Sequence, residues 1–206
     1  MFKEKKWSNR IQLILLFIIF LAPLVGAYYA FYTRDHSVHD TVNKGEFYST
    51  PQDLADTGFV MTNNNGESQI KQFNDFDNRW YLMVVANNEC NKICESNLEK
   101  IAYVRVVHAR YTGRIVSTFA HFGLSAERSQ QLIDNFGLMG ISPQTAEGFQ
   151  EWLKPFYEAR DQSQFDSDRI YMIDPLKKLM MSYPSDVSPL DIYEDMKRLL
   201  KTSRVG

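Results

Sequence analysis

The two cysteines of the chain, Cys90 and Cys94, lie close together in the segment Asn88–Glu95. Thiolates are nucleophiles and also bind soft metal ions, so this pair is the part of the sequence best suited to chemistry. Residues i and i+4 share one face of a helix. With Cys90 at the cap of a helix, the two sulfurs can form a disulfide, and they can equally hold an ion such as Cu(I) between them.

The cysteines follow a segment that predicts a buried strand. Residues 80–86 are a continuous apolar run, which is typical of a strand covered on both faces in a parallel sheet. A helical pattern over about 90–110 and a second apolar strand over 115–122 complete a βαβ unit with two parallel strands. Cys90 is therefore expected at the carboxyl end of the sheet and at a helix start, where free backbone N–H groups favour a thiolate.

The remaining elements surround this unit and give the fold class. The sequence predicts the following: a hairpin near 59–61 and 69–71, a helix over 126–135 between Ser125 as N-cap and Gly137 as stop, a helix from about Thr145 that bends or breaks at Pro155, a hairpin of 169–173 and 179–183, and a last helix with Ser188 as N-cap, Pro189 at N1 and the apolar face Leu190, Tyr193, Met196 and Leu200. This order is that of an α/β thioredoxin-like sandwich, a central mixed sheet with flanking helices.

Composition and charge exclude several classes of protein. The 206 residues suit about one domain, and 44% hydrophobic with 14% aromatic residues excludes collagen-like, low-complexity and disordered chains. The net charge is −2, of which residues 1–10 carry +3 and the rest −5. A nucleic-acid-binding protein needs a basic face, so we expect no nucleic-acid partner.

An apolar segment near the N-terminus predicts a membrane anchor. Residues 11–32 contain no charged side chain, and a helix of this length spans a bilayer core of about 30 Å. Because short basic flanks stay cytoplasmic, the chain after the anchor is expected on the opposite side of the membrane. The predicted organisation is therefore as follows: a cytoplasmic basic N-terminus at 1–10, a transmembrane helix at 11–33, a tether at 34–42 and an exported thioredoxin-like domain at 43–206.

A cleavable signal peptide is the alternative interpretation of the same segment. The small residues Val25-Gly26-Ala27 resemble a processing site. The apolar run is longer than the roughly 7–15 residues of a signal-peptide core, and aromatic residues follow the triplet, which favours the anchor. In both interpretations the bulk of the chain is exported.

The chain resembles the Sco family, membrane-anchored thioredoxin-like proteins that assist copper-centre assembly in cytochrome c oxidase. The resemblance rests on the N-terminal anchor, on the Cys-x-x-x-Cys of Cys90 and Cys94 after a core strand, and on the Ile170–Pro175 segment before a C-terminal helix. It implies a copper cofactor, an oxidase subunit or another assembly factor as partner, and a periplasmic domain on a single-pass inner-membrane anchor. It favours an assembly factor over an enzyme.

The sequence departs from the Sco pattern at the metal ligands. Sco proteins carry a proline after each cysteine, where this chain has Asn91 and Glu95. Their histidine ligand precedes the Asp-Pro pair, and the corresponding position here is Asp166. His121, at the end of the second strand of the βαβ unit, is the candidate replacement, which gives a predicted copper site of Cys90, Cys94 and His121.

Two functions from different classes follow from these features. In the first, Cys90 and Cys94 handle copper or exchange disulfides with a partner, with Cys90 as the attacking thiolate and Cys94 as the resolving one. In the second, the chain is a non-catalytic, membrane-anchored interaction module, and the two cysteines form a structural disulfide in an oxidising compartment.

Overall fold

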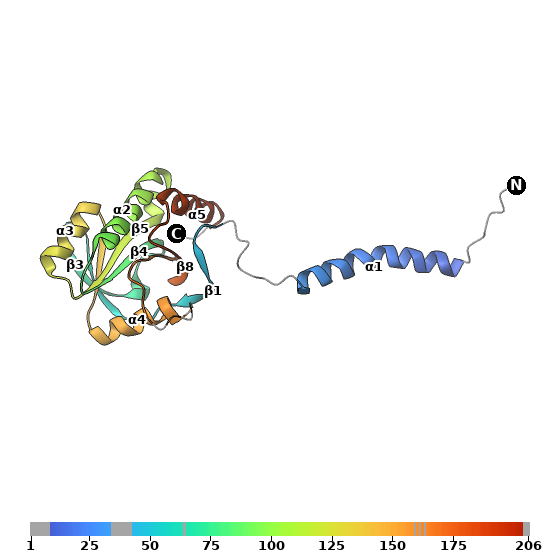
Figure 1. The fold of residues 1–206 in the computed structure, drawn as a ribbon, viewed down its shortest axis with the longest axis horizontal. Helices are drawn as coiled ribbons and strands as arrows, with labels where there is room; N and C mark the ends of the chain where they lie inside the picture. The colour runs from blue at the N-terminus through green and yellow to red at the C-terminus, as the bar shows by residue number, and fades with distance from the viewer. Residues whose placement is uncertain are drawn as a thin grey trace. The chain divides into compact units, whose positions relative to one another are not determined.

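The computed structural model divides the chain into two compact units, Met1–Asp40 and Thr41–Gly206. The described residues are 9–33, 43–63, 65–158, 160, 162 and 164–203. The tether predicted at 34–42 lies outside them. Each unit is treated by itself below (Figure 1).

The first unit is one long helix, α1, over Asn9–Thr33, with Pro23 inside it. Its segment Ile11–Tyr29 is long and apolar enough to cross a membrane, and its side chains are exposed in the absence of a bilayer. An exposed apolar helix of this length is unfavourable in water, so α1 has to be inserted into a lipid bilayer or cleaved from the rest of the chain. A signal sequence near an N-terminus can meet the same criteria of length and hydropathy, so the helix by itself fits an anchor and a cleaved leader.

The second unit is built on a mixed sheet with the strand order β1-β8-β7-β4-β5-β6-β2-β3. Its strands are β1 (Glu46–Asp53), β2 (Gly58–Thr62), β3 (Ser68–Gln72), β4 (Trp80–Asn87), β5 (Ile115–Phe122), β6 (Met139–Pro143), β7 (Ile170–Ile173) and β8 (Lys178–Tyr183). The central strands β4, β5 and β6 are parallel neighbours, and the other pairs are antiparallel. The parallel β4–β5 pair confirms the predicted βαβ unit.

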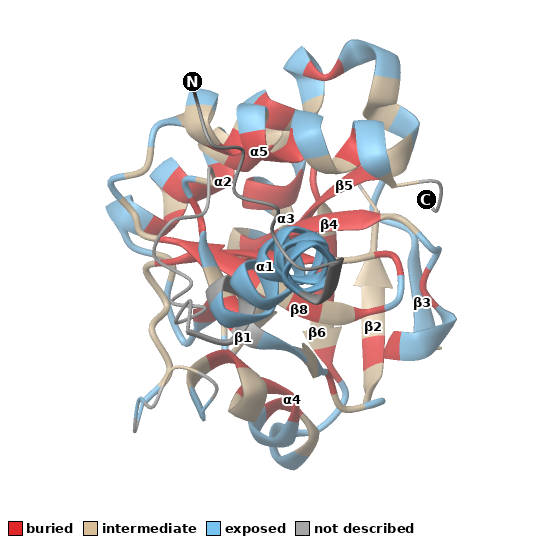
Figure 2. Cartoon of the chain, turned by 90° about the vertical axis from the view of Figure 1, so that its right-hand side faces the viewer, coloured by how far each residue is buried: buried red, intermediate tan, exposed pale blue. Residues whose placement is uncertain are grey.

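Helices cover both faces of this sheet, as Figure 2 shows, with α2 and α5 on one side and α4 on the other. The helices are α2 (Lys92–Val107), α3 (Ala126–Phe136), α4 (Ala146–Glu158) and α5 (Pro189–Thr202), and η2 (Phe73–Asp75) and η3 (Ala109–Arg114) are short 3-10 turns. This arrangement is the predicted thioredoxin-like sandwich.

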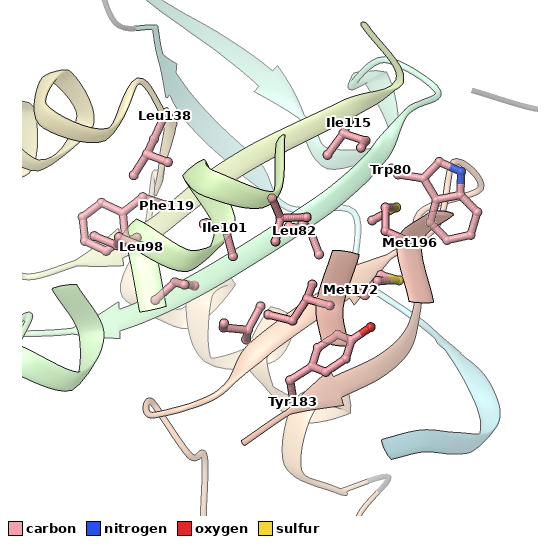
Figure 3. Close-up of a cluster of buried hydrophobic side chains, with 14 of the residues drawn as sticks. Trp80, Leu82, Leu98, Ile101, Ile115, Phe119, Leu138, Met172, Tyr183 and Met196 are labelled. Carbon is pink, nitrogen blue, oxygen red and sulfur yellow. The ribbon is translucent and has the colours of Figure 1, made fainter. Parts of the chain in front are cut away.

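Two buried clusters fill the two sides of the sheet, because side chains alternate along each strand. On β4, Leu82 and Val84 belong to the cluster under α2 and α5, which Figure 3 shows in part. Met83 and Val85 belong to the cluster under α4. All four are fully buried, as expected for a central strand covered on both faces.

The first residues of this unit are fastened to its last helix. Asp195 on α5 is fully buried, and its Oδ2 accepts the backbone N–H groups of Lys44 at 2.8 Å and Gly45 at 3.0 Å. The hydroxyl of Tyr183 donates to the same oxygen at 3.3 Å. A buried carboxylate needs such donors to offset its desolvation, so Asp195 fixes where the domain begins.

Most predicted elements are confirmed, and the differences have physical causes. The helix predicted from Thr145 does not end at Pro155 but continues to Glu158, because Trp152 and Phe156 bury side chains on both sides of the proline. On the last helix, Leu190 is exposed and Ile192 takes its place in the core. Strands β1 and β6 had no counterpart in the sequence prediction.

Candidate functional site

The loop that carries Cys90 is fixed at the carboxyl ends of β4 and β5. After Asn87, the backbone of Asn88 takes a left-handed conformation (φ 67°), and its N–H donates to the carbonyl of Phe122 at 2.7 Å. Gly123 also has a positive φ of 79°, and a Cβ there would lie 2.4 Å from Oδ1 of Asn88. Only glycine fits this close approach, so the loop before Cys90 rests directly on the end of β5.

Asn91 sets the start of α2 and separates the two cysteines. It is the N-cap: its Oδ1 accepts the N–H of Cys94 at 2.9 Å, and its carbonyl accepts the N–H of Glu95 at 3.0 Å. Cys90 therefore lies just before the cap, and Cys94 lies in the first turn of the helix. The prediction that the helix begins at about residue 90 was early by two residues, because asparagine is a strong N-cap and its side chain is satisfied there.

Cys90 and Cys94 form a disulfide, with their Cα atoms 5.2 Å apart. The two sulfurs have different surroundings. Cys94 is only 3% exposed and belongs to the cluster under α2, whereas Cys90 is partly exposed at the edge of that cluster. Cys90 is therefore the more accessible of the two to a thiol or disulfide of a partner, and Cys94 is enclosed in the cluster.

One of the charges beside the pair, that of Glu95, is compensated. Glu95, directly after Cys94, forms an ion pair with Arg128 of α3. The ion pair ties α2 to α3 and offsets the negative charge that would otherwise disfavour a thiolate at this helix start. Sequence reasoning considered neither Arg128 nor the cap of Asn91, although an asparagine directly before a helical pattern is a recognisable N-cap signal.

His121 lies on the same face of the sheet as α2. It pairs with Ala86 in the register of β4 and β5, and its ring lies 5.2 Å from that of Phe119, a member of the cluster under α2. Burial lowers the pKa of His121 to about 4, so the imidazole is neutral at pH 7. No group of three or more His, Cys, Asp or Glu side chains is placed to hold a metal within the described ranges. The three-ligand copper site therefore stays a prediction.

The loop that would carry the histidine of the Sco pattern is held by other contacts. The side-chain carboxylate of Asp166 accepts the N–H of Asp168 at 2.9 Å. The backbone carbonyl of Asp166 accepts the hydroxyl of Tyr171 at 2.7 Å. Asn97 of α2 donates from Nδ2 to the carbonyl of Asp168 at 3.1 Å. The side chain of Asp166 thus organises its own loop, and the loop is anchored to the helix that carries Cys94.

The comparisons with known proteins agree with this fold. A family model described as transmembrane-like, thioredoxin-like, C-terminal domain matches residues 80–203, which is more than half of the chain. The chain belongs to this family of thioredoxin-like domains. No curated protein matches the sequence.

Sco proteins are among the similar solved structures. ScoI of Arabidopsis thaliana with copper bound has a TM-score of 0.55 at 12% identity, covering 73% of this chain and 99% of that one. Yeast Sco1 with copper bound has a TM-score of 0.55 at 13% identity, with coverages of 75% and 96%. BsSco, described as a Sco-family oxidase assembly protein with a disulfide switch, has a TM-score of 0.50 at 11% identity, with coverages of 75% and 98%. The expected Sco-like fold is confirmed.

Proposed function

We propose that this chain is a membrane-anchored thiol–disulfide exchange protein that assists the assembly of a respiratory oxidase, with Cys90 and Cys94 as its reacting residues. The observation that carries the proposal is the disulfide at the start of α2, with one sulfur accessible and the other buried. The Sco-like fold supports an assembly role, because the similar BsSco is described as a cytochrome c oxidase assembly protein.

The reaction follows from the difference between the two sulfurs. In the reduced protein, the Cys90 thiolate attacks a disulfide of the partner, which forms a mixed disulfide and releases one partner thiolate. The Cys94 thiolate then attacks the sulfur of Cys90, which releases the second partner thiolate and forms the Cys90–Cys94 bond. The partner gains two electrons and its thiolates take up two protons, while the pair in this chain is oxidised.

The location and partners belong to the same proposal. The basic segment 1–10 stays in the cytoplasm, 11–33 spans the inner membrane as a single pass, 34–42 is the tether, and 43–206 works in the periplasm on an oxidase subunit or another assembly factor. Support comes from the apolar helix Ile11–Tyr29 and from the basic residues before it.

Single cysteine variants test the exchange reaction. We expect Cys94→Ser to accumulate mixed disulfides with a partner, because Cys90 attacks and nothing resolves the product. Cys90→Ser leaves a buried thiol and should trap almost nothing. The readout is non-reducing electrophoresis after acid quenching of membranes, with the double Cys→Ser variant as the blank. Equal trapping by the two single variants would contradict the assigned roles.

Copper handling is a second candidate function, with Cu(I) as cargo rather than as a resident cofactor. Two similar Sco structures hold copper. The neutral imidazole of His121, on the sheet face that α2 covers, is chemically suited to act as a third ligand beside two reduced cysteines. The test is an anaerobic Cu(I) titration of the reduced chain against a competing chelator. Tight binding that is lost in Cys90→Ser and weakened in His121→Ala is the expected result, and binding unchanged in Cys90→Ser would contradict it.

The non-catalytic module is the alternative to both activities. Its support is that a disulfide buried on one side also stabilises a helix start without any turnover. Oxidase assembly that continues at the normal level with the double Cys→Ser variant would establish the module and end both cysteine proposals.

A further inference from the structure

A cavity of about 260 Å³ lies at the edge of the sheet where the parallel strands begin. This is the edge opposite to the one that carries Cys90, because Arg79 directly precedes β4, Val116 lies at the start of β5, and Leu138 and Met139 lie at the start of β6. Arg105 of α2 and Met61 of β2 also line the cavity, together with Asn63, Ser117 and Gly137.

Two arginines in this lining have buried donors without acceptors. The Nε atoms of Arg79 and Arg105 are buried and have no hydrogen-bond partner among the described residues. Among the described residues one other buried guanidinium atom lacks a partner, Nη1 of Arg160, and that residue does not line this cavity. Two of the three unpartnered arginine donors therefore belong to residues of this cavity. Such unmet donors leave both guanidinium charges poorly solvated, and an anion in the cavity that these two residues line would offset that cost.

The charges around the cavity favour an anion over water. Arg79 is paired with Asp77 at 2.5 Å, so its charge is partly compensated. Arg105 donates from Nη1 to the carbonyl of Gly137 at 3.1 Å, and no carboxylate of the described residues forms an ion pair with it. Glu67, on the neighbouring hairpin, has its Oε2 held by Nδ2 of Asn63 at 2.9 Å. Among the lining residues two are cationic and none is anionic, and one of the two cations, Arg105, has no paired carboxylate among the described residues.

The rest of the lining is mainly apolar, with Asn63 and Ser117 as its neutral polar residues. Met61, Val116, Leu138 and Met139 contribute apolar side chains, and the volume lies below the roughly 300–1,000 Å³ of pockets for drug-sized ligands. An inorganic anion would leave these walls without a partner, whereas a short aliphatic chain would bury against them.

We propose that this cavity binds a small aliphatic carboxylate, with the carboxylate on the guanidinium groups of Arg105 and Arg79 and the chain against Met61 and Met139. Guanidinium groups bind carboxylates through paired, charge-assisted hydrogen bonds, and the two methionines provide a flexible apolar wall. The site is separate from Cys90 and Cys94 and does not depend on the function proposed for them.

The two methionines supply a local readout. The full chain, with ¹³C-methyl methionine, is placed in phosphatidylcholine nanodiscs and titrated with hexanoate at pH 7. We expect saturable shifts of the Met61 and Met139 methyl signals. Met83 and Met172, which are buried in the two core clusters, should not shift, and their signals report that the domain remains folded.

Matched ligands and variants decide the outcome. Hexanamide, acetate and inorganic phosphate should bind at least tenfold more weakly than hexanoate, because each lacks either the charge or the chain. Arg105→Gln should weaken hexanoate binding at least tenfold, whereas Arg110→Gln, an exposed arginine outside the lining, should not change it. No shift with hexanoate, an equal response to phosphate or acetate, or unchanged binding in a folded Arg105→Gln chain would each overturn the proposal.

Discussion

The two faces of the central sheet are filled in different ways. Under α4 the core is largely aromatic, and rings from distant parts of the chain meet there: Trp152 lies 5.2 Å from Phe59, 5.7 Å from Phe73 and 4.7 Å from Phe156, measured between ring centroids. Under α2 and α5 the core is mostly aliphatic, and Cys94 is one of its members.

The two faces therefore differ in role, because one stabilises the fold and the other positions the cysteine pair. Large rings that contact one another bury much surface, and here they hold helix α4 and the turn η2 against the sheet. The aliphatic face instead has to position the start of one helix, α2, with one cysteine inside the core and the other at its edge. We therefore expect the ring contacts of the aromatic face to support the fold, whereas the aliphatic face positions the candidate site.

The largest expected effect removes the centre of the aromatic face. Trp152→Ala should lower the free energy of unfolding by about 3–5 kcal/mol, because it leaves a cavity among the rings. Urea unfolding of the full chain in a mild detergent, followed by circular dichroism, measures this loss. Trp152→Phe is the matched control: it keeps a ring and removes the indole N–H, which has no partner among the described residues, so it should cost clearly less. Equal losses in both variants would show that the ring contacts of position 152 do not support the aromatic face.

A smaller effect is expected at the helix start on the other face. Asn91→Ala removes the acceptor of the Cys94 N–H and should lower the free energy of unfolding by about 1 kcal/mol. The same variant should also change the reduction potential of the Cys90–Cys94 pair, which a glutathione redox titration measures. Ser96→Ala, at an exposed position of α2, should change neither quantity. An Asn91→Ala chain with the stability and the reduction potential of the parent would show that the Asn91 cap does not support the site.

A third effect sharpens the comparison through its dependence on pH. Burial lowers the pKa of His121 to about 4, below the value of about 6.5 for a free imidazole, so the unfolded chain binds more protons between these values. Stability should therefore fall as the pH drops from about 6.5 to about 4. Burial also lowers the pKa of His108, so protonation of His108 makes a second, independent contribution to the loss of stability at low pH.

His121→Asn isolates the contribution of His121. The urea midpoint of this variant should fall less between pH 7 and pH 4.5 than that of the parent chain. His108→Asn serves as the comparison, because it removes the other buried imidazole and leaves His121 in place. A parent-like pH dependence in His121→Asn would show that the imidazole is solvated and does not face the cluster under α2.

The sequence was most informative where local patterns agree with the final packing. The apolar runs at 80–86 and 115–122, the left-handed Gly137 after α3 and the Ser188-Pro189 cap of α5 all predicted their elements correctly. In each case the signal is local, since it depends on side-chain periodicity or on the backbone preference of one residue.

The remaining features depend on contacts between distant residues, which local patterns do not contain. Strand β6 is short and includes Gly140 and Pro143, and it exists because β5 and β2 pair with its two sides. The placement of Cys90 just outside the helix depends on the contact of Asn88 with the end of β5. The sequence identified the cysteine pair, but it did not predict that one sulfur is buried and the other accessible.

The hydrogen bonds from Lys44 and Gly45 to Asp195 also set an order in time. The first residues of the domain have their acceptor about 150 positions later, on α5. The first strand, β1, likewise pairs with the late strand β8. Because synthesis runs from the N-terminus, these first residues cannot find their partners until β8 and α5 have been made. During that interval Cys90 and Cys94 are already outside the ribosome, and the domain that will shelter Cys94 is still incomplete.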